Sequence, residues 1–308
     1  MTSALRIGIV GIGKIARDQH LPAIAASSQF TLVATASHQG QVAGVPAFDS
    51  IEAMLADGPE LDVVSICTPA QGRAELVRAA IAAGKPVMLE KPPGATVSEV
   101  TALAHAAARA GVPLFTAWHS REAAGVAAAR DWLADRVLRS ASIVWREDIR
   151  SWHPGQEWIL GPGGFGVFDP GINALSIATE IFPGNLVVTG GELRVPDGRH
   201  SPIAASLELA VGAARVTAEF DFLETGQQTW DIAVETDRGA LRLEGGGGRL
   251  LIDGEDRPVE SPGEYPRLYR RFAELVAAGE SDVDARPLGL VADAYLQSRR
   301  ITVEPFEF

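Results

Sequence analysis

The chain has 308 residues, of which 46% are hydrophobic and 21% are charged, and its formal net charge is −12. This composition argues against an intrinsically disordered chain, and the length favours two domains because one domain commonly takes ~100–200 residues. The negative charge argues against nucleic acid and an anionic membrane as partners, because both bind clustered positive surfaces. The charge does not identify a substrate: a neutral sugar is compatible with it, and so are many other small molecules.

The only cysteine, Cys67, lies in the apolar run Val63–Cys67. It cannot form a disulfide within the chain, and a zinc site built on cysteines is excluded. We expect it to be a buried strand residue. No secretion signal is recognisable at the start of the sequence, and no apolar run reaches the ~20 residues that span a bilayer. These observations predict a cytoplasmic protein.

The first part of the chain alternates short apolar runs with segments of helical pattern. We expect strands at residues 5–10, 30–36, 62–67, 86–89 and 113–117, and helices at 14–27, 50–55, 71–83, 97–110 and 123–134. We expect Ser50 to be the N-cap of the second of these helices. Strands that alternate with helices at this spacing are typical of βαβ units and a parallel sheet.

Strands dominate the rest of the chain. We expect them at residues 139–149, 186–194, 203–210, 215–222, 229–236, 240–244 and 249–252, followed by helices at 266–278 and 288–300. Several alternate apolar and polar residues, as an antiparallel sheet with one covered face does. We therefore predict an α/β protein with a Rossmann parallel sheet in a dinucleotide-binding domain at 1–120. A substrate-binding α+β domain with a largely antiparallel, open-faced sheet is expected at 121–308.

The first expected strand runs into Gly11-Ile12-Gly13-Lys14-Ile15-Ala16, which matches the pattern G-x-G-x-x-G/A. In dinucleotide-binding turns the first glycine makes the tight turn and the second lets the main chain approach the pyrophosphate. The third position must be small so that the helix can pack on the strand, and the helix N-terminus faces the phosphates. The alternative is a tight turn without a ligand. We predict that a nicotinamide dinucleotide contacts Gly11, Gly13, Lys14 and Ile15.

The end of the second expected strand bears on the choice between NAD and NADP. NAD enzymes usually place Asp or Glu there to hold the ribose hydroxyls. This chain has Ala36-Ser37-His38-Gln39, which carries no carboxylate to repel a 2′-phosphate. Ser37 and His38 can both donate hydrogen bonds, although His38 is a weaker phosphate ligand than arginine. We predict NADP or NAD as cofactor, with a slight preference for NADP; the alternative for both side chains is a solvated turn.

The run Leu89-Glu90-Lys91-Pro92, together with the glycine turn and the later sheet, resembles the glucose–fructose oxidoreductase/inositol dehydrogenase (Gfo/Idh/MocA) family over essentially the whole chain. In that family this motif lies beside the nicotinamide and its lysine takes part in catalysis, which implies the same of Lys91. We also expect Thr68 and Glu90, which end or follow expected strands, to contact the cofactor.

Longer blocks are similar to the bacterial D-galactose/L-arabinose 1-dehydrogenases of that family. They are Gly11–His20, Glu90–Thr96, Trp118–Ser120, Trp152–Gln156 and Phe168–Leu175. The resemblance implies an NAD(P)-dependent oxidoreductase of carbohydrate metabolism. Its reaction would be oxidation of an aldopyranose (D-galactose, L-arabinose or D-fucose) at C1 to the aldonolactone.

One position departs from the wider family, in which many members carry Asp-x-x-x-His with the histidine as general base. The matching residues are Asp169 and Asn173, and an asparagine cannot accept a proton as a base. Proton abstraction then falls to Asp169, Lys91 or both. Asp169 is the leading candidate, with Asn173 and Lys91 positioning and polarising O1. If a helix starts near Pro170, Asp169 and Asn173 share one face; the alternative is that Asp169 is merely an N-cap.

Lys91 follows an apolar strand, and ligands of parallel sheets bind at the carboxyl ends of the strands. In a desolvated site it could act as the base, or remain charged and stabilise an oxyanion. The sequence leaves both roles open beside the alternative of a surface lysine.

A sugar ring needs several polar contacts, because a misplaced ring does not react. The candidates are polar or aromatic residues near expected strand ends, each with a core or solvated role as its alternative: His119, Glu147, Trp152, His153 and Trp230. No His, Asp and Glu spacing predicts a metal site. We expect the active site in the cleft between the domains, and a possible homodimer. The rival functions are a cyclitol or other sugar dehydrogenase of this family, and a non-catalytic NAD(P)-binding regulator.

Overall fold

The computed structural model describes residues 3–308, which form two compact units. The first unit contains the residues up to His119 together with Pro262–Ala285, and the second contains Ser120–Ser261 and Arg286–Phe308. The sequence-based division at residue 120 placed Pro262–Ala285 in the second domain, whereas the structure places it in the first. Among residues 3–308, no helix combines the length and the apolar character needed to cross a bilayer.

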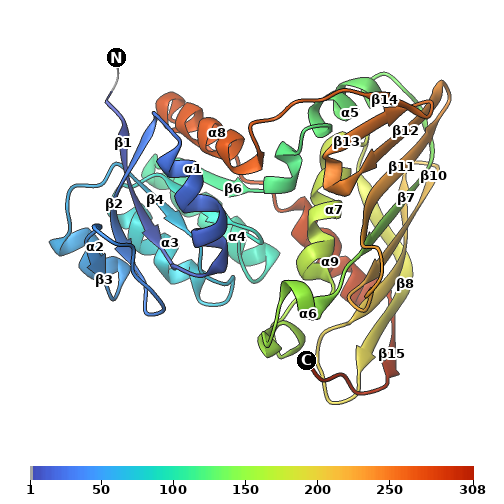
Figure 1. Cartoon of the computed structure of the whole chain (residues 1–308), viewed down its shortest axis with the longest axis horizontal. Coiled ribbons are helices and arrows are strands. Elements are labelled where there is room, and N and C mark those ends of the chain that lie inside the picture. Colours follow the sequence, from blue (N-terminus) through green and yellow to red (C-terminus); the bar gives the residue numbers. More distant parts are fainter. Residues whose placement is uncertain (1–2) are drawn as a thin grey trace. The chain divides into compact units, whose positions relative to one another are not determined.

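The first unit contains a parallel sheet of six strands in the order β3-β2-β1-β4-β5-β6 (Figure 1). The strands are β1 (Leu5–Val10), β2 (Phe30–Ala36), β3 (Ala47–Phe48), β4 (Val63–Ile66), β5 (Val87–Glu90) and β6 (Leu114–Ala117). This order reverses direction between β1 and β4, as in doubly wound nucleotide-binding sheets. The predicted Rossmann sheet is therefore confirmed. The two-residue strand β3 was not predicted, because it is too short to carry a period.

The helices of the first unit are α1 (Leu21–Ala25), α2 (Ile51–Asp57), α3 (Arg73–Ala82), α4 (Val97–Ala110) and α8 (Glu264–Ala278). Ser50 caps α2 as predicted, because its side chain accepts a hydrogen bond from the Ala53 amide at 3.1 Å. The single helix predicted over 14–27 is instead a π-helical segment, Ala16–His20, followed by the short α1.

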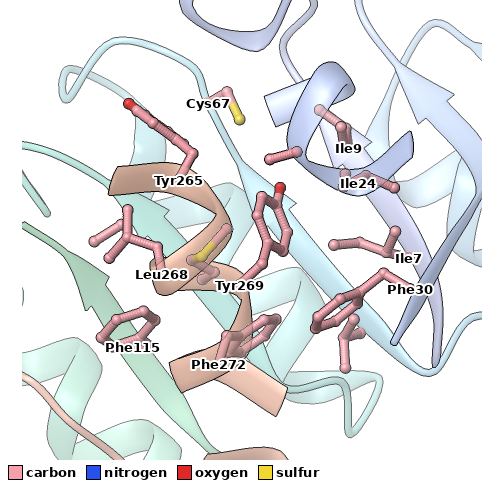
Figure 2. Packing of buried hydrophobic residues seen from close by; sticks show 14 of the residues in the cluster. Ile7, Ile9, Ile24, Phe30, Cys67, Phe115, Tyr265, Leu268, Tyr269 and Phe272 are labelled. Atoms are coloured by element: carbon pink, nitrogen blue, oxygen red, sulfur yellow. The ribbon is translucent and has the colours of Figure 1, made fainter. Parts of the chain in front are cut away.

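Helix α8 completes the core on one side of the first sheet. Figure 2 shows Tyr265, Leu268, Tyr269 and Phe272 projecting from this helix among apolar residues of the strands. The Phe272 ring stacks on Phe30 with centroids 6.1 Å apart. This apolar face is the physical reason that Pro262–Ala285 belongs to the first unit.

The second unit contains a sheet of nine strands in the order β14-β13-β12-β11-β7-β10-β9-β8-β15. The strands are β7 (Leu138–Arg146), β8 (Leu186–Pro196), β9 (Ala204–Val211), β10 (Ala214–Asp221), β11 (Thr229–Thr236), β12 (Gly239–Glu244), β13 (Arg249–Ile252), β14 (Glu255–Arg257) and β15 (Arg299–Val303). Two neighbouring pairs, β7 with β10 and β8 with β15, are parallel and the others are antiparallel. The predicted largely antiparallel sheet is confirmed.

The helices of the second unit are α5 (Val126–Leu133), α6 (Ile149–Trp152), α7 (Phe168–Ile181) and α9 (Arg286–Gln297). Two predicted boundaries are wrong. The strand expected to reach residue 149 ends at Arg146, because Asp148 caps α6 by accepting a hydrogen bond from the Arg150 amide at 2.9 Å. The helix expected to reach residue 300 ends at Gln297, because Arg299–Val303 pairs with β8 as an edge strand.

Candidate active site

The glycine turn after β1 has the geometry that a dinucleotide requires. Gly11 has a φ of +90°, and a Cβ there would lie 2.8 Å from Thr68 Cγ2, so only glycine fits. A Cβ built at Gly13 meets nothing within 4 Å, so the main chain is open to an approaching ligand. Ala16 at the third position is fully buried. These three environments match the three roles that the motif assigns to its small residues.

The side chain of Ser37 ties the loop after β2 to this turn. Its Oγ accepts hydrogen bonds from the amides of Ile12 and Gln39, both at 3.1 Å. The hydroxyl proton can still be donated to a ligand. His38 is exposed beside it, as a phosphate contact requires. The structure adds Arg17, which sequence reasoning missed: its Nη2 lies 3.4 Å from the carbonyl oxygen of Gln41 in the same loop.

Thr68 follows β4 and supplies a polar atom without a protein partner. Its Oγ1 is buried and makes no hydrogen bond within the described residues. A buried hydroxyl without a partner costs about 1–3 kcal/mol, so such an atom marks a place where a ligand can restore the lost bond. Together with the open main chain at Gly13, this atom indicates that the residues present fit a bound nicotinamide dinucleotide.

Arg73, at the start of α3, holds the loops that follow β4 and β5. It is 2% exposed, and its guanidinium donates hydrogen bonds to the carbonyl oxygens of Thr68, Glu90 and Pro92. Burial lowers the pKa of Arg73 to about 10, so the group stays charged at neutral pH. Sequence reasoning missed this residue, because nothing local distinguishes it from a surface arginine of a helix.

Glu90 ends β5 as a buried carboxylate, and Lys91 follows it, half-buried, at the carboxyl edge of the sheet. Glu90 Oε1 accepts hydrogen bonds from His20 Nε2 at 3.0 Å and the Tyr265 hydroxyl at 2.6 Å. Its Oε2 accepts one from the Lys91 amide at 2.8 Å. Burial alone would raise the pKa of Glu90, but the bond and charge of His20 outweigh it and lower the pKa to about 2. Glu90 is therefore ionised at neutral pH and has no proton to donate as a general acid.

His119, predicted to contact a sugar, follows β6 in the first unit. Its Nδ1 lies 2.6 Å from Glu264 Oε2, and its ring stacks on Tyr265 with centroids 5.6 Å apart. A carboxylate therefore holds the imidazole in one orientation from the start of α8. Sequence reasoning missed Glu264 and Tyr265, because they lie far along the chain from His119.

In the second unit, Asp169 lies in the first turn of α7 and Asn173 one turn later, on the same face. Helix α7 begins at Phe168, close to the predicted start, and its N-cap is Val167. The alternative reading of Asp169 as the N-cap is therefore wrong. His153 Nε2 lies 3.6 Å from Asp169 Oδ2, so the structure brings together two predicted site residues. A carboxylate at a helix N-terminus is stabilised as an anion.

Three other predicted site residues of the second unit form an aromatic corner, defined here as Glu147, Trp152 and Trp230. Trp230 Nε1 donates a hydrogen bond to the buried Glu147 carboxylate at 2.9 Å. The Trp152 and Trp230 rings meet edge to face with centroids 5.9 Å apart. Trp152 is 45% exposed and Trp230 half-buried, so neither is a core residue. Such a corner offers the flat apolar surface and the polar edge that a pyranose ring contacts.

Comparison with known proteins identifies the family. Residues 5–118 match the model of an oxidoreductase family with an NAD-binding Rossmann fold, named GFO_IDH_MocA. The chain is 48% identical over 303 residues to a galactose 1-dehydrogenase from Pseudomonas fluorescens, with 98% of each chain covered. The protein belongs to the Gfo/Idh/MocA oxidoreductase family. The resemblance inferred from the motifs is confirmed.

Solved structures agree with this assignment. A crystal structure of a D-galactose 1-dehydrogenase protein from Rhizobium etli has a TM-score of 0.95 and 50% identity, covering 100% of this chain and 99% of the other. A 3-ketoreductase from Actinomadura kijaniata, solved with NADP and TDP-benzene, has a TM-score of 0.83 at 21% identity, covering 97% and 99%. The second likeness concerns the fold alone. As a Gfo/Idh/MocA oxidoreductase, the protein has the predicted nicotinamide dinucleotide as its cofactor class.

Proposed function

We propose that this Gfo/Idh/MocA oxidoreductase is an aldose 1-dehydrogenase that oxidises D-galactose, L-arabinose or D-fucose at C1 to the aldonolactone, with NAD(P)⁺ as acceptor. The observation that carries the proposal is the Asp169–Asn173 pair on one face of α7, with His153 at 3.6 Å from the Asp169 carboxylate. The substrate class is supported by galactose 1-dehydrogenases that are 48% and 50% identical over nearly the whole chain.

In this reaction Asp169, Asn173 and Lys91 act on the anomeric hydroxyl of the sugar. A nicotinamide dinucleotide held by the glycine turn after β1 would supply the acceptor for the hydride that leaves C1. Asp169 takes the proton of the anomeric hydroxyl, and Asn173 orients that hydroxyl through its amide. Lys91 polarises O1 and stabilises its developing charge. The aromatic corner binds the pyranose, with the Trp152 ring against carbon–hydrogen bonds and Glu147 near the hydroxyls.

A panel of sugars tests this assignment. We expect the purified protein to reduce NADP⁺ with D-galactose, L-arabinose and D-fucose, because these sugars share the configuration of ring carbons 2 to 4. The measurement is the absorbance of reduced nicotinamide, with each sugar and with both NADP⁺ and NAD⁺. If no aldose supports reduction, the proposed reaction is wrong. Oxidation of a cyclitol instead would favour the first rival, and cofactor binding without turnover of any polyol would favour the regulator.

Within this function, we propose that the cofactor preference lies slightly toward NADP. Ser37 and His38 leave the loop after β2 without a carboxylate, and Arg17 adds a cation to it. A homodimer and a cytoplasmic location stay predictions.

The exposed His38 offers a direct test of that preference. We expect His38→Asp to shift the ratio of kcat/KM for NADP⁺ over NAD⁺ toward NAD⁺ by about tenfold or more, because the new carboxylate repels a 2′-phosphate and accepts bonds from ribose hydroxyls. The measurement is steady-state kinetics with each cofactor at saturating sugar. His105→Asp, on the exposed side of α4, is the control. An unchanged ratio would mean that residue 38 does not face the 2′-position.

A further inference from the structure

A buried chain of hydrogen bonds lies behind the Glu90-Lys91 segment of the first unit. It joins His20 of the π-helical segment, Glu90 of β5, and Tyr265 and Tyr269 of α8. All four residues are at most 3% exposed. Figure 2 shows the two tyrosines one turn apart on the same helix. None of the four takes part in the reaction as proposed above.

The contacts leave His20 one orientation. Its Nε2 lies 3.0 Å from Glu90 Oε1, and because an ionised carboxylate only accepts, Nε2 carries the proton. Its Nδ1 lies 2.8 Å from the Tyr269 hydroxyl. The imidazole ring of His20 also makes edge-to-face contacts with the rings of Tyr265 and Tyr269, with centroids 4.9 Å and 5.8 Å apart. Neither a flip nor a tilt of the imidazole is possible without breaking one of these contacts.

The same contacts set the orientation of the Glu90 carboxylate. Oε1 is taken by His20 and Tyr265, so Oε2 is directed to the Lys91 amide at 2.8 Å. Other polar side chains surround the pair formed by His20 and Glu90. Ser65 Oγ lies 3.5 Å from His20 Nδ1 and 3.6 Å from Cys67 Sγ, and Arg73 donates to the Glu90 carbonyl oxygen. His119, which stacks on Tyr265 and lies 2.6 Å from Glu264, is a further titratable neighbour.

A carboxylate buried at this depth is expensive, because it loses its hydration. An apolar residue in its place would pack against the sheet without that penalty. The carboxylate that carries this desolvation cost belongs to Glu90, the residue directly before Lys91. Its second oxygen, Oε2, accepts a hydrogen bond from the Lys91 main-chain amide. Buried polar groups that bond a site residue in this way commonly set its position.

We propose that His20 and Tyr265 are positioning residues, which orient the Glu90 carboxylate so that it fixes the main chain of Lys91. This inference rests on the proposed function, in which Lys91 polarises O1.

Two substitutions test the proposal with little change of volume. Tyr265→Phe removes one donor to Glu90 and keeps the ring against His119, whereas His20→Leu removes the other donor. His20→Gln keeps a side-chain N–H donor and should restore part of the function. His105→Leu, exposed on α4, is the control for replacing a histidine. The readouts are kcat, KM for D-galactose, the Kd for NADP⁺ from fluorescence titration, the melting temperature, and the Lys91 amide shift in NMR spectra of isotope-labelled protein.

We expect Tyr265→Phe and His20→Leu to lower kcat by about 10- to 100-fold, because a small displacement of a reacting group costs that much. KM for the sugar and the Kd for NADP⁺ should stay near their wild-type values. The Lys91 amide proton should move upfield as its bond to Glu90 weakens, and His20→Gln should lie between His20→Leu and wild type.

A lower melting temperature with kcat and the Lys91 amide shift unchanged would overturn the proposal, since that is what a purely structural network predicts. If His20→Leu does not fold, Tyr265→Phe decides alone. If the wild-type protein oxidises no aldose, the proposed function fails. The Lys91 amide shift then still tests the positioning role, and an unmoved shift in Tyr265→Phe contradicts it.

Discussion

Asp169→Asn is expected to lower kcat for D-galactose by about 10²- to 10⁴-fold, the range that a positioned general base contributes. The substitution keeps the volume and the hydrogen-bonding oxygen of the side chain but removes its ability to accept a proton. Because the residues expected to contact the cofactor all belong to the first unit, we expect the Kd for NADP⁺ to stay unchanged. Steady-state kinetics over a range of pH, with a separate titration of NADP⁺, measure both quantities.

The control for this substitution is Asp131→Asn, an exposed carboxylate on α5, which should leave kcat at the wild-type value. His153→Gln changes the side chain that lies 3.6 Å from the Asp169 carboxylate. It should lower kcat less than Asp169→Asn does, because it removes a residue that orients the base rather than the base itself. Near-normal turnover by Asp169→Asn at neutral pH would show that Asp169 is not the base. Lys91→Met would then be expected to abolish proton abstraction.

Arg73→Met is expected to lower the free energy of unfolding by about 3 kcal/mol, the second large effect. The substitution leaves three buried carbonyl oxygens with fewer donors, and each such loss costs about 1–3 kcal/mol. The substitution also removes the desolvation cost of a buried cation, which offsets part of this loss. Methionine retains the volume of the aliphatic stem, so a cavity contributes little. Urea denaturation followed by circular dichroism measures the change.

Arg78→Met is the matched control, since Arg78 lies on the same helix with a side chain that is 47% exposed and pairs only with Glu75 among the ion pairs described. Its effect should stay within about 0.5 kcal/mol. Arg73→Lys should recover only part of the loss, because an ammonium cannot reproduce the planar fork of the guanidinium. Equal effects of Arg73→Met and Arg78→Met would mean that the buried guanidinium does not stabilise the carbonyl groups.

Features with a local signature could be predicted from the sequence. The glycine turn, the Ser50 cap and the alternation of strands and helices each depend on residues within one or two turns of one another. The start of α7 was also predicted within two residues, because Pro170 favours the first turn of a helix. These local features were enough to indicate the fold class and the cofactor class.

Features that depend on distant pairs could not be predicted. Glu90 is 70 residues from His20 and 175 from Tyr265, and no period in the sequence connects them. The buried guanidinium of Arg73 is satisfied partly by two carbonyl groups that are 17 and 19 residues away, those of Glu90 and Pro92. Likewise, the sequence of Arg299–Val303 is compatible with the end of a helix. The segment forms a strand because it pairs with β8, which is distant in the sequence.

The place of α8 in the first unit has a consequence for the order in which the protein is made. During translation, the strands that carry Ile7, Ile9 and Phe30 leave the ribosome long before the residues of α8, because the chain between them forms most of the second unit. Until α8 is synthesised, one face of the first sheet lacks part of its apolar cover, and exposed apolar surface of this kind attracts chaperones or other chains. The nascent N-terminal domain therefore matures only after most of the second unit has been synthesised.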